Sequence, residues 1–218
     1  GIGGNFWLYW AGISENVPEA NGDAGAWINN LIETGKIPPM IIVTPDDEDG
    51  HWGATNDTMV TQELVSYIDT HWRTIPHRWG RAIEGFSMGG MGASHYGALH
   101  PGTYCSTNIM AIPGVEDNLQ DWQANRKAIL ANDLAVQLAV GDDDNDAYDS
   151  TIALHDGLVM LDIPHTIEIA TGVGHVFGEL YNVVGVKSLQ FHAKCFMEHQ
   201  ESIERIFLPV LQRTYIPR

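Results

Sequence analysis

Apolar residues along the chain follow two spacings that alternate from one end to the other. Short continuous apolar runs are bounded by Gly, Asn or Pro, and between them lie longer segments whose apolar residues return every three or four positions. The short runs are typical of buried strands, and the longer segments are typical of amphipathic helices. We expect strands at 6–10, 40–44, 81–86, 106–112, 134–140 and 165–170. We expect helices at 23–36, 57–73, 88–100, 119–130, 151–162 and 183–199.

This alternation of strands and helices predicts an α/β fold. Its simplest arrangement is a doubly wound, mostly parallel sheet of about six strands with helices on both faces. The sequence has no internal repeat, low-complexity tract or linker, so residues 1–218 are expected to form one domain. In sheets of this class, ligands and reactive groups gather at the carboxyl ends of the strands.

The charge balance narrows the range of partners. The chain carries 28 acidic and 11 basic residues, a formal net charge of −17. Such a charge argues against binding to nucleic acid or to an anionic membrane surface, and it is compatible with neutral or cationic substrates. No apolar run approaches the ~18 residues of a membrane span. We expect neither a cofactor nor a metal ion.

The two cysteines are Cys105, at the start of an expected strand, and Cys195, in the last expected helix. Two cysteines this far apart do not form the dense pattern of a disulfide framework, so we interpret them as buried thiols.

The most specific motif is the pentapeptide Gly85-Phe86-Ser87-Met88-Gly89. It lies between an apolar strand and a helix of small residues, which is the strand–turn–helix context of a nucleophile elbow. Glycines at both ends remove the Cβ atoms that would collide where the strand turns back into the helix. The alternative is a glycine-rich turn that only needs room. We favour Ser87 as a nucleophile.

A serine nucleophile needs a base, and the base needs an orienting acid. The strand at 134–140 runs into an acidic loop that begins Gly141-Asp142-Asp143-Asp144, and the strand at 165–170 runs into Gly174-His175. Both loops are expected at the edge that carries Ser87. The alternatives are a solvated histidine, a charged surface loop, or a calcium loop. A calcium loop would need Gly and Glu where the chain has Ala147 and Ala153.

Over most of its length the chain resembles the esterase-D-like branch of the α/β-hydrolases, which includes feruloyl and acetyl-xylan esterases. The segments that carry the resemblance are 30–36, 39–45, 84–90 and the two late loops. The resemblance implies Ser87 as nucleophile and His175 as base. In that family the acid is the third residue after the glycine that ends the strand, which is Asp144. It also implies a secreted protein.

The oxyanion hole of such an enzyme needs two backbone N–H donors. Met88, which follows the nucleophile, is one. The resemblance places the second after the strand at 6–10, which makes Ala11 the preferred donor. An alternative alignment uses residues 1–4 as that loop and makes Ile2 the donor. His51 and Trp52, in the acidic loop after the strand at 40–44, either line the substrate pocket or are plain surface residues.

Family members usually have strands before the one at 6–10, and we expect a sheet without these N-terminal edge strands. Their absence would leave the apolar strand at 40–44 as an open edge. We therefore expect either a homodimer through that edge or a covering arm from a terminus, for which Ile206–Tyr215 is a candidate.

The expected activity is hydrolysis of feruloyl or acetyl esters of plant cell-wall polysaccharides, a step in xylan degradation. Two alternatives use the same residues: a thioesterase of the S-formylglutathione type and a sugar acyltransferase. An alternative of another class is a non-catalytic carbohydrate-binding protein that retains an inactive elbow.

Overall fold

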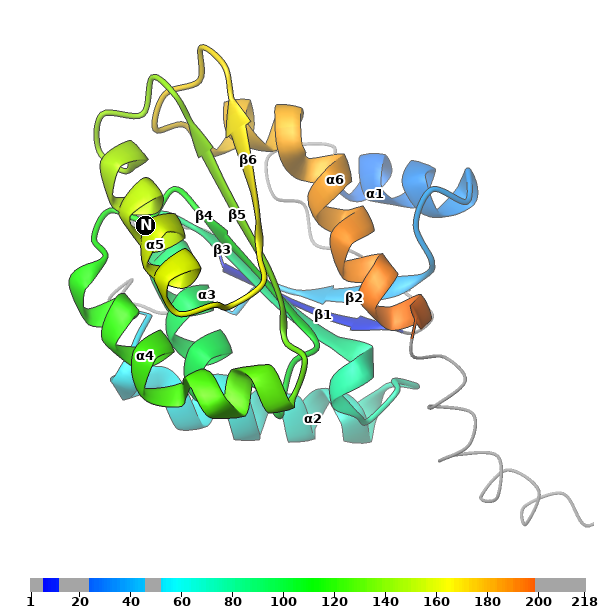
Figure 1. Ribbon diagram of the computed structural model, residues 1–218. Coiled ribbons are helices and arrows are strands. Elements are labelled where there is room, and N and C mark those ends of the chain that lie inside the picture. Colours follow the sequence, from blue (N-terminus) through cyan, green and yellow to red (C-terminus); the bar gives the residue numbers. More distant parts are fainter. Residues whose placement is uncertain (1–5, 12–23, 46–51, 199–218) are drawn as a thin grey trace, which may run out of the picture.

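The computed structural model describes residues 6–11, 24–45 and 52–198, whose strands form one sheet in the order β2-β1-β3-β4-β5-β6 (Figure 1). The strands are β1 (Phe6–Ala11), β2 (Met40–Val43), β3 (Arg81–Phe86), β4 (Ser106–Met110), β5 (Ala135–Gly141) and β6 (Thr166–Ala170). The α-helices are α1 (Ala24–Glu33), α2 (Leu64–His71), α3 (Met88–Leu99), α4 (Glu116–Ala131), α5 (Tyr148–Met160) and α6 (Phe177–Glu198). Short helical turns are η1 (Ala54–Asn56), η2 (Met59–Glu63, a π-helical turn) and η3 (Arg78–Gly80).

Five of the six described strands run in one direction: β3, β4, β5 and β6 are paired in parallel, and β2 shares their direction. β1 is antiparallel to both of its neighbours, β2 and β3. The expected mostly parallel sheet is therefore confirmed, with one reversed strand that the apolar pattern did not indicate.

Helices cover both faces of the sheet, as expected of a doubly wound fold. On one face, α1 and α6 pack over side chains such as Ala82, Phe86 and Met110. On the other face, α2 and α3 pack over Ile83, while α4 and α5 pack over Ile109. No helix of the described residues is long and apolar enough to cross a bilayer.

The last helix begins earlier than the sequence pattern predicted. The expected range was 183–199, but α6 starts at Phe177. Leu180 is buried and Tyr181 is half-buried, so the packed face of the helix already includes its first two turns. Gly178 and Glu179, both exposed, interrupt the helical spacing of apolar residues at the start of α6, so the sequence pattern did not show this part of the helix.

Cys105 and Cys195 form a disulfide, so their interpretation as separate thiols is wrong. α6 crosses the sheet, and its last turns lie over the start of β4, where the two Cα atoms are 6.3 Å apart. The burial of both residues was expected and is confirmed, at 0% and 5% exposure. A strand and a helix 90 residues apart meet here only because of the sheet topology, which cysteine spacing does not reveal.

Among the described strands, β2 is at the edge, since it lies at one end of the sheet order. Its inward residues Met40 and Ile42 are buried, and Ile41 and Val43 are half-buried. Whether a second copy or a terminal arm covers this edge stays a prediction, and the candidate arm Ile206–Tyr215 lies outside the described residues.

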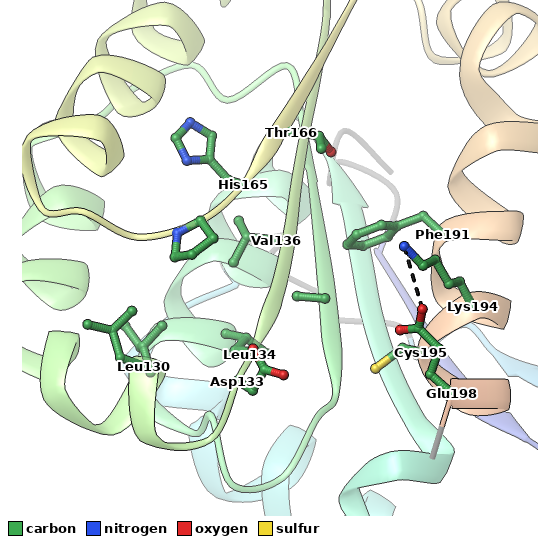
Figure 2. A pocket seen from close by; sticks show the side chains of 13 residues that line it. Leu130, Asp133, Leu134, Val136, His165, Thr166, Phe191, Lys194, Cys195 and Glu198 are labelled. Carbon is green, nitrogen blue, oxygen red and sulfur yellow. Dashed lines mark ion pairs between the residues drawn. The ribbon is translucent and has the colours of Figure 1, made fainter. Parts of the chain in front are cut away.

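A pocket of about 390 Å³ opens between the starts of β5 and β6 and the end of α6 (Figure 2). Leu134, Val136 and Phe191 form part of its apolar lining, and Asp133 and Lys194 are among its charged residues. Because Leu134 and Thr166 stand at the amino ends of β5 and β6, the pocket lies at the edge of the sheet opposite Ser87. It is therefore not where the predicted nucleophile stands.

Removing the disulfide is expected to lower the free energy of unfolding. For a loop of this length, the double variant Cys105→Ser/Cys195→Ser should lose about 2–4 kcal/mol, because its unfolded chain regains conformational freedom. Urea unfolding of both proteins measures the difference. The control is a thiol titration of urea-unfolded wild-type protein, and two reactive thiols without reductant would contradict the disulfide.

Alkaline pH is expected to destabilise the fold through Tyr104. This phenol is fully buried and donates to the carbonyl of Val60 (3.3 Å). Burial raises its pKa well above the ordinary value of about 10. Only the unfolded chain then ionises this phenol near pH 10, so its stabilising effect is present below that pH and is lost above it. In urea unfolding at pH 8 and pH 10.5, Tyr104→Phe should lose less stability with rising pH than wild type. Equal losses would contradict this assignment.

Candidate active site

Ser87 occupies a strained turn between β3 and α3. Its backbone has φ 57° and ψ −120°, a region that residues other than glycine rarely adopt. The turn is held from both sides, because Ser87 N donates to the carbonyl of Met110 (2.9 Å) and Ser87 O accepts from the N–H of Met91 (3.0 Å). The side chain stands partly exposed beyond the end of β3.

Glycine is required at two positions around this turn. A Cβ at Gly85 would overlap the backbone carbonyl of Gly89, and a Cβ at Gly90 would lie 2.5 Å from the carbonyl oxygen of Met110. Backbone atoms cannot yield without moving the turn itself. These glycines therefore permit the close approach of β3, β4 and α3 that projects Ser87 outward.

Three side chains from separate loops form one hydrogen-bonded chain. His175 Nε2 lies 2.8 Å from Ser87 Oγ, and His175 Nδ1 lies 2.8 Å from Asp144 Oδ2. The carboxylate can only accept, so we assign the imidazole proton to Nδ1, which leaves Nε2 to accept from the serine hydroxyl. This is the geometry that a nucleophile, its base and the orienting acid require.

In the acidic loop after β5, Asp144 is buried and faces His175, whereas the two residues before it are exposed. The side chain of Asp144 is fully buried, and its Oδ1 accepts from the N–H groups of Asp146 (3.0 Å) and Ala147 (2.9 Å). Asp142 and Asp143 are exposed, and Asp142 Oδ1 instead accepts from the N–H of Gly172 (2.6 Å). Two backbone donors thus fix the carboxylate that faces His175.

Aromatic side chains pack beside the histidine. The ring of Phe86 lies 4.8 Å from that of His175, and the ring of Phe177 lies 5.7 Å from that of Phe86. Phe86 is buried, whereas Phe177 and His175 are half-buried. The apolar contact restrains the imidazole ring while leaving its serine-facing edge accessible.

The structure contradicts the preferred second oxyanion donor. In the antiparallel pairing, Phe6 lies opposite Gly85, while Trp10 lies opposite Arg81, the first residue of β3. Ala11 therefore lies at the far edge of the sheet, roughly 20 Å along the strand from Ser87. The assignment of Ala11 is wrong, because an apolar run predicts a strand but not its direction. The alternative donor, Ile2, lies outside the described residues.

The Esterase family model matches residues 12–156, about two thirds of the chain. The chain belongs to the Esterase family.

Among relatives, an endo-1,4-β-xylanase/feruloyl esterase of Xylanibacter ruminicola is 32% identical over 124 residues, which cover 45% of this chain and 16% of that protein. An esterase of Mycobacterium tuberculosis is 36% identical over 85 residues, which cover 34% of this chain and 19% of that protein. The matched part is therefore less than a fifth of each of these longer relatives.

Among solved structures, a ferulic acid esterase superposes with a TM-score of 0.68 at 22% identity, covering 79% of this chain and 77% of the other. The fluorophosphonate-binding serine hydrolase F of Staphylococcus aureus superposes with a TM-score of 0.62 at 14% identity, covering 77% and 75%. These likenesses confirm the α/β-hydrolase fold, and the family match confirms the esterase resemblance seen in the sequence.

The remaining predicted site residues of this esterase-family chain have mixed outcomes. Met88 begins α3 directly after Ser87, where first-turn N–H groups lack intrahelical acceptors, and its donor role stays a prediction. Trp52 is buried, at 7% exposure, in the apolar cluster under α2 and α3, so the surface alternative is wrong and its pocket role stays a prediction. His51 lies outside the described residues.

Asp144, Asp146 and His175 offer ligand atoms within 4.8 Å of one another. A metal ion bound there through Nδ1 would displace the hydrogen bond between His175 and Asp144. The expectation of a metal-free site stays a prediction.

One polar residue near the site was missed by the sequence analysis. Glu84, three residues before Ser87, is fully buried in β3. The signal was an acidic residue in the middle of a largely apolar strand, a combination that requires hydrogen-bond donors from elsewhere in the fold.

Substituting Gly85 is expected to disrupt the turn. Gly85→Ala should lower the free energy of unfolding by roughly 1–3 kcal/mol, because the new methyl group overlaps the Gly89 backbone. Thermal or urea unfolding measures the loss. The matched control is Gly102→Ala, whose Cβ would make only an ordinary contact, 3.9 Å from Asn132 Oδ1. Equal stability of the two variants would contradict the steric requirement at Gly85.

Proposed function

We propose that this chain hydrolyses carboxylic esters through an acyl-enzyme formed on Ser87. The observation that carries the proposal is the 2.8 Å hydrogen bond at each nitrogen of His175, one to Ser87 and one to Asp144. Membership of the Esterase family supports the choice of an ester as substrate. The intact chain of three groups also disfavours the alternative of a non-catalytic carbohydrate-binding protein.

In the proposed first half-reaction, Ser87 Oγ attacks the ester carbonyl while His175 Nε2 takes the hydroxyl proton. The buried Asp144 carboxylate stabilises the resulting imidazolium through its bond to Nδ1–H. The imidazolium then returns the proton to the alkoxide leaving group as the C–O bond of the ester breaks. In the second half-reaction, water replaces the alcohol and the same proton transfers release the acid and regenerate Ser87.

The tetrahedral intermediate of each half-reaction carries a negative oxygen that needs N–H donors. We assign one of them to Met88, because its amide opens α3 and adjoins the nucleophile. The positive end of the α3 dipole points toward the same place and favours the developing charge. The second donor is left to residues before β1, with Ile2 as the remaining candidate from the sequence.

For the substrate, we propose feruloyl or acetyl esters of plant cell-wall polysaccharide. Support comes from the Xylanibacter relative named as a xylanase and feruloyl esterase. The half-buried ring of Phe177, packed near His175 through Phe86, offers a surface on which a planar phenolic acyl group can stack. The net charge of −17 gives no electrostatic attraction to an anionic glutathione thioester, which makes the S-formylglutathione alternative less suitable.

We also propose that the enzyme works outside the cell or in another oxidising compartment. The Cys105–Cys195 disulfide supports this placement, since structural disulfides persist where thiols are not kept reduced.

Replacing the nucleophile tests the proposal. Ser87→Ala is expected to lower kcat on p-nitrophenyl acetate and methyl ferulate by at least about 10⁴-fold, because no hydroxyl remains to form the acyl-enzyme. Initial rates on these two esters and on S-formylglutathione, measured side by side, also rank the acyl groups. Wild-type protein should bind a fluorophosphonate probe once per chain, and Ser87→Ala should bind none.

The matched control is Ser66→Ala, which removes an exposed serine hydroxyl on α2. It should hydrolyse and label like wild type. Hydrolysis by folded Ser87→Ala at the wild-type rate would refute the serine mechanism, whereas a fast reaction only with S-formylglutathione would keep the mechanism and overturn the proposed substrate.

A further inference from the structure

Glu84 is an acidic side chain with no access to solvent, in the strand that carries the nucleophile. It lies in the middle of β3, pairs across the sheet with Asn108 of β4, and is 0% exposed. Like Ala82 and Phe86, it faces α6 rather than α3. A buried carboxylate is costly unless several donors compensate it, so its surroundings must be built to match.

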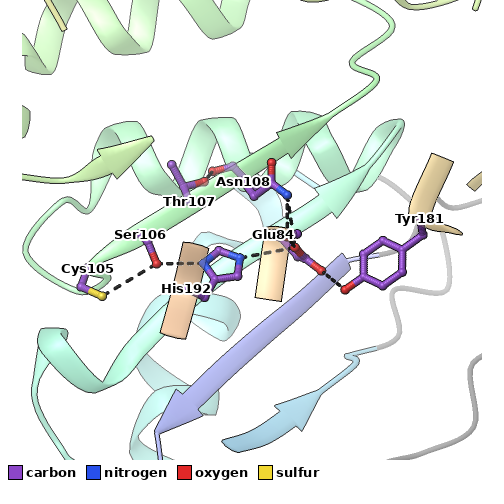
Figure 3. Close-up of polar contacts among 9 residues, drawn as sticks. Glu84, Cys105, Ser106, Thr107, Asn108, Tyr181 and His192 are labelled. Carbon is purple, nitrogen blue, oxygen red and sulfur yellow. Dashed lines mark hydrogen bonds and ion pairs between the residues drawn. The ribbon is translucent and has the colours of Figure 1, made fainter. Parts of the chain in front are cut away.

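Among the described residues, four side chains donate to this carboxylate, and Figure 3 labels three of them, Asn108, Tyr181 and His192. The Tyr181 hydroxyl donates to Oε1 (2.9 Å), and Oε2 accepts from Asn108 Nδ2 (3.3 Å) and His192 Nε2 (3.3 Å). The Ser188 hydroxyl also donates to Oε2. Three of the four donors belong to α6, at spacings of seven and four residues that place them on one face of the helix.

The donors are themselves held in place. Asn108 Nδ2 also donates to Ser188 Oγ (2.7 Å), and the Ser106 hydroxyl lies 2.8 Å from His192 Nδ1. With the proton of His192 assigned to Nε2, each of the four described side chains donates a hydrogen bond to the Glu84 carboxylate. A shift of α6 along its axis by one turn would remove all three helical donors together, so the network fixes the register of α6 on β3.

The register of α6 in turn sets the position of His175. The helix begins at Phe177, two residues after the imidazole. The rings of Phe177 and Tyr181 are 5.0 Å apart, and Phe177 also packs against Phe86, which contacts His175. Tyr181 thus belongs both to the carboxylate network and to the aromatic packing around the histidine.

We infer that Glu84 is a positioning residue. It acts through Tyr181, Ser188 and His192 to hold His175 at hydrogen-bond distance from Ser87. This inference rests on the proposed function, since positioning matters for rate only if Ser87 and His175 react. The separation at stake is small: proton transfer needs the 2.8 Å contact, and a misplacement of about 1 Å costs up to about 10²-fold in rate.

The test compares two serine-to-alanine variants in buried helix positions. Ser188→Ala removes one donor of the Glu84 network. Ser94→Ala, on α3, removes the hydroxyl that accepts from Trp122 Nε1 on α4 (2.8 Å). Both serines are buried, and each substitution removes buried hydrogen bonds: Ser188 loses those with Glu84 and Asn108, and Ser94 loses the one with Trp122. Of the two serines, only Ser188 joins α6 to β3. Glu84→Gln removes the charge with little change in shape, and Tyr181→Phe removes a single hydroxyl if Glu84→Gln does not fold.

With p-nitrophenyl acetate as the substrate, Ser188→Ala and Glu84→Gln are expected to lower kcat roughly 10- to 100-fold with little change in KM. Ser94→Ala should lose comparable stability and keep the wild-type kcat. If kcat is unchanged in the network variants, or is lowered equally in Ser94→Ala, Glu84 supports folding only and the inference is wrong.

A second measurement does not depend on hydrolysis. The Nδ1 proton that His175 shares with Asp144 is expected to give a low-field NMR resonance, assigned by its loss in His175→Gln. It should shift in Glu84→Gln and Ser188→Ala and remain in place in Ser94→Ala. An active Ser87→Ala variant would refute the proposed function alone, whereas an unmoved resonance in the network variants would refute the positioning role alone.

Discussion

The parallel alignment of β3, β4, β5 and β6 is the constraint on which the rest of the structure depends. Because these strands share a direction, the loops that follow β3, β5 and β6 all emerge at one edge of the sheet. Ser87, Asp144 and His175 can therefore meet although they are far apart in sequence. The strained backbone of Ser87 and the backbone donors to Asp144 then refine positions that the sheet has already brought close.

The two faces of the sheet are built with different chemistry. The face under α3, α4 and α5 is largely apolar, with Ile109, Leu138 and Leu154 in its core. The face under α6 contains buried polar side chains on neighbouring strands, among them Glu84, Asn108 and Gln137. Apolar packing tolerates small sliding, whereas hydrogen bonds to a buried carboxylate do not. The helix that follows His175 is therefore held on the sheet by hydrogen bonds, which tolerate less displacement than apolar packing does.

Much of the fold and two of the three central site residues could be predicted because local patterns encode them. β3 was predicted at its observed bounds, and Ser87 and His175 were chosen from a glycine-rich turn and a strand end. Asp144 was chosen among the acidic residues of its loop from the spacing in the resembled family. Strand direction, long-range cysteine pairing and the burial of Trp52 could not be predicted. Each of these depends on which elements become neighbours in space, and neither Ala11 nor Cys195 carries a local signal of its partner.

The disulfide has a consequence for how the protein should be produced. Cys105 directly precedes Ser106, whose hydroxyl contacts His192, so the covalent link reaches α6 one turn beyond the polar network. Protein made in a reducing cytosol would contain every reacting side chain yet lack the covalent anchor of the helix behind its histidine. Preparations of identical sequence would then differ in the rigidity of that helix, depending on whether the protein was made in a reducing or an oxidising compartment.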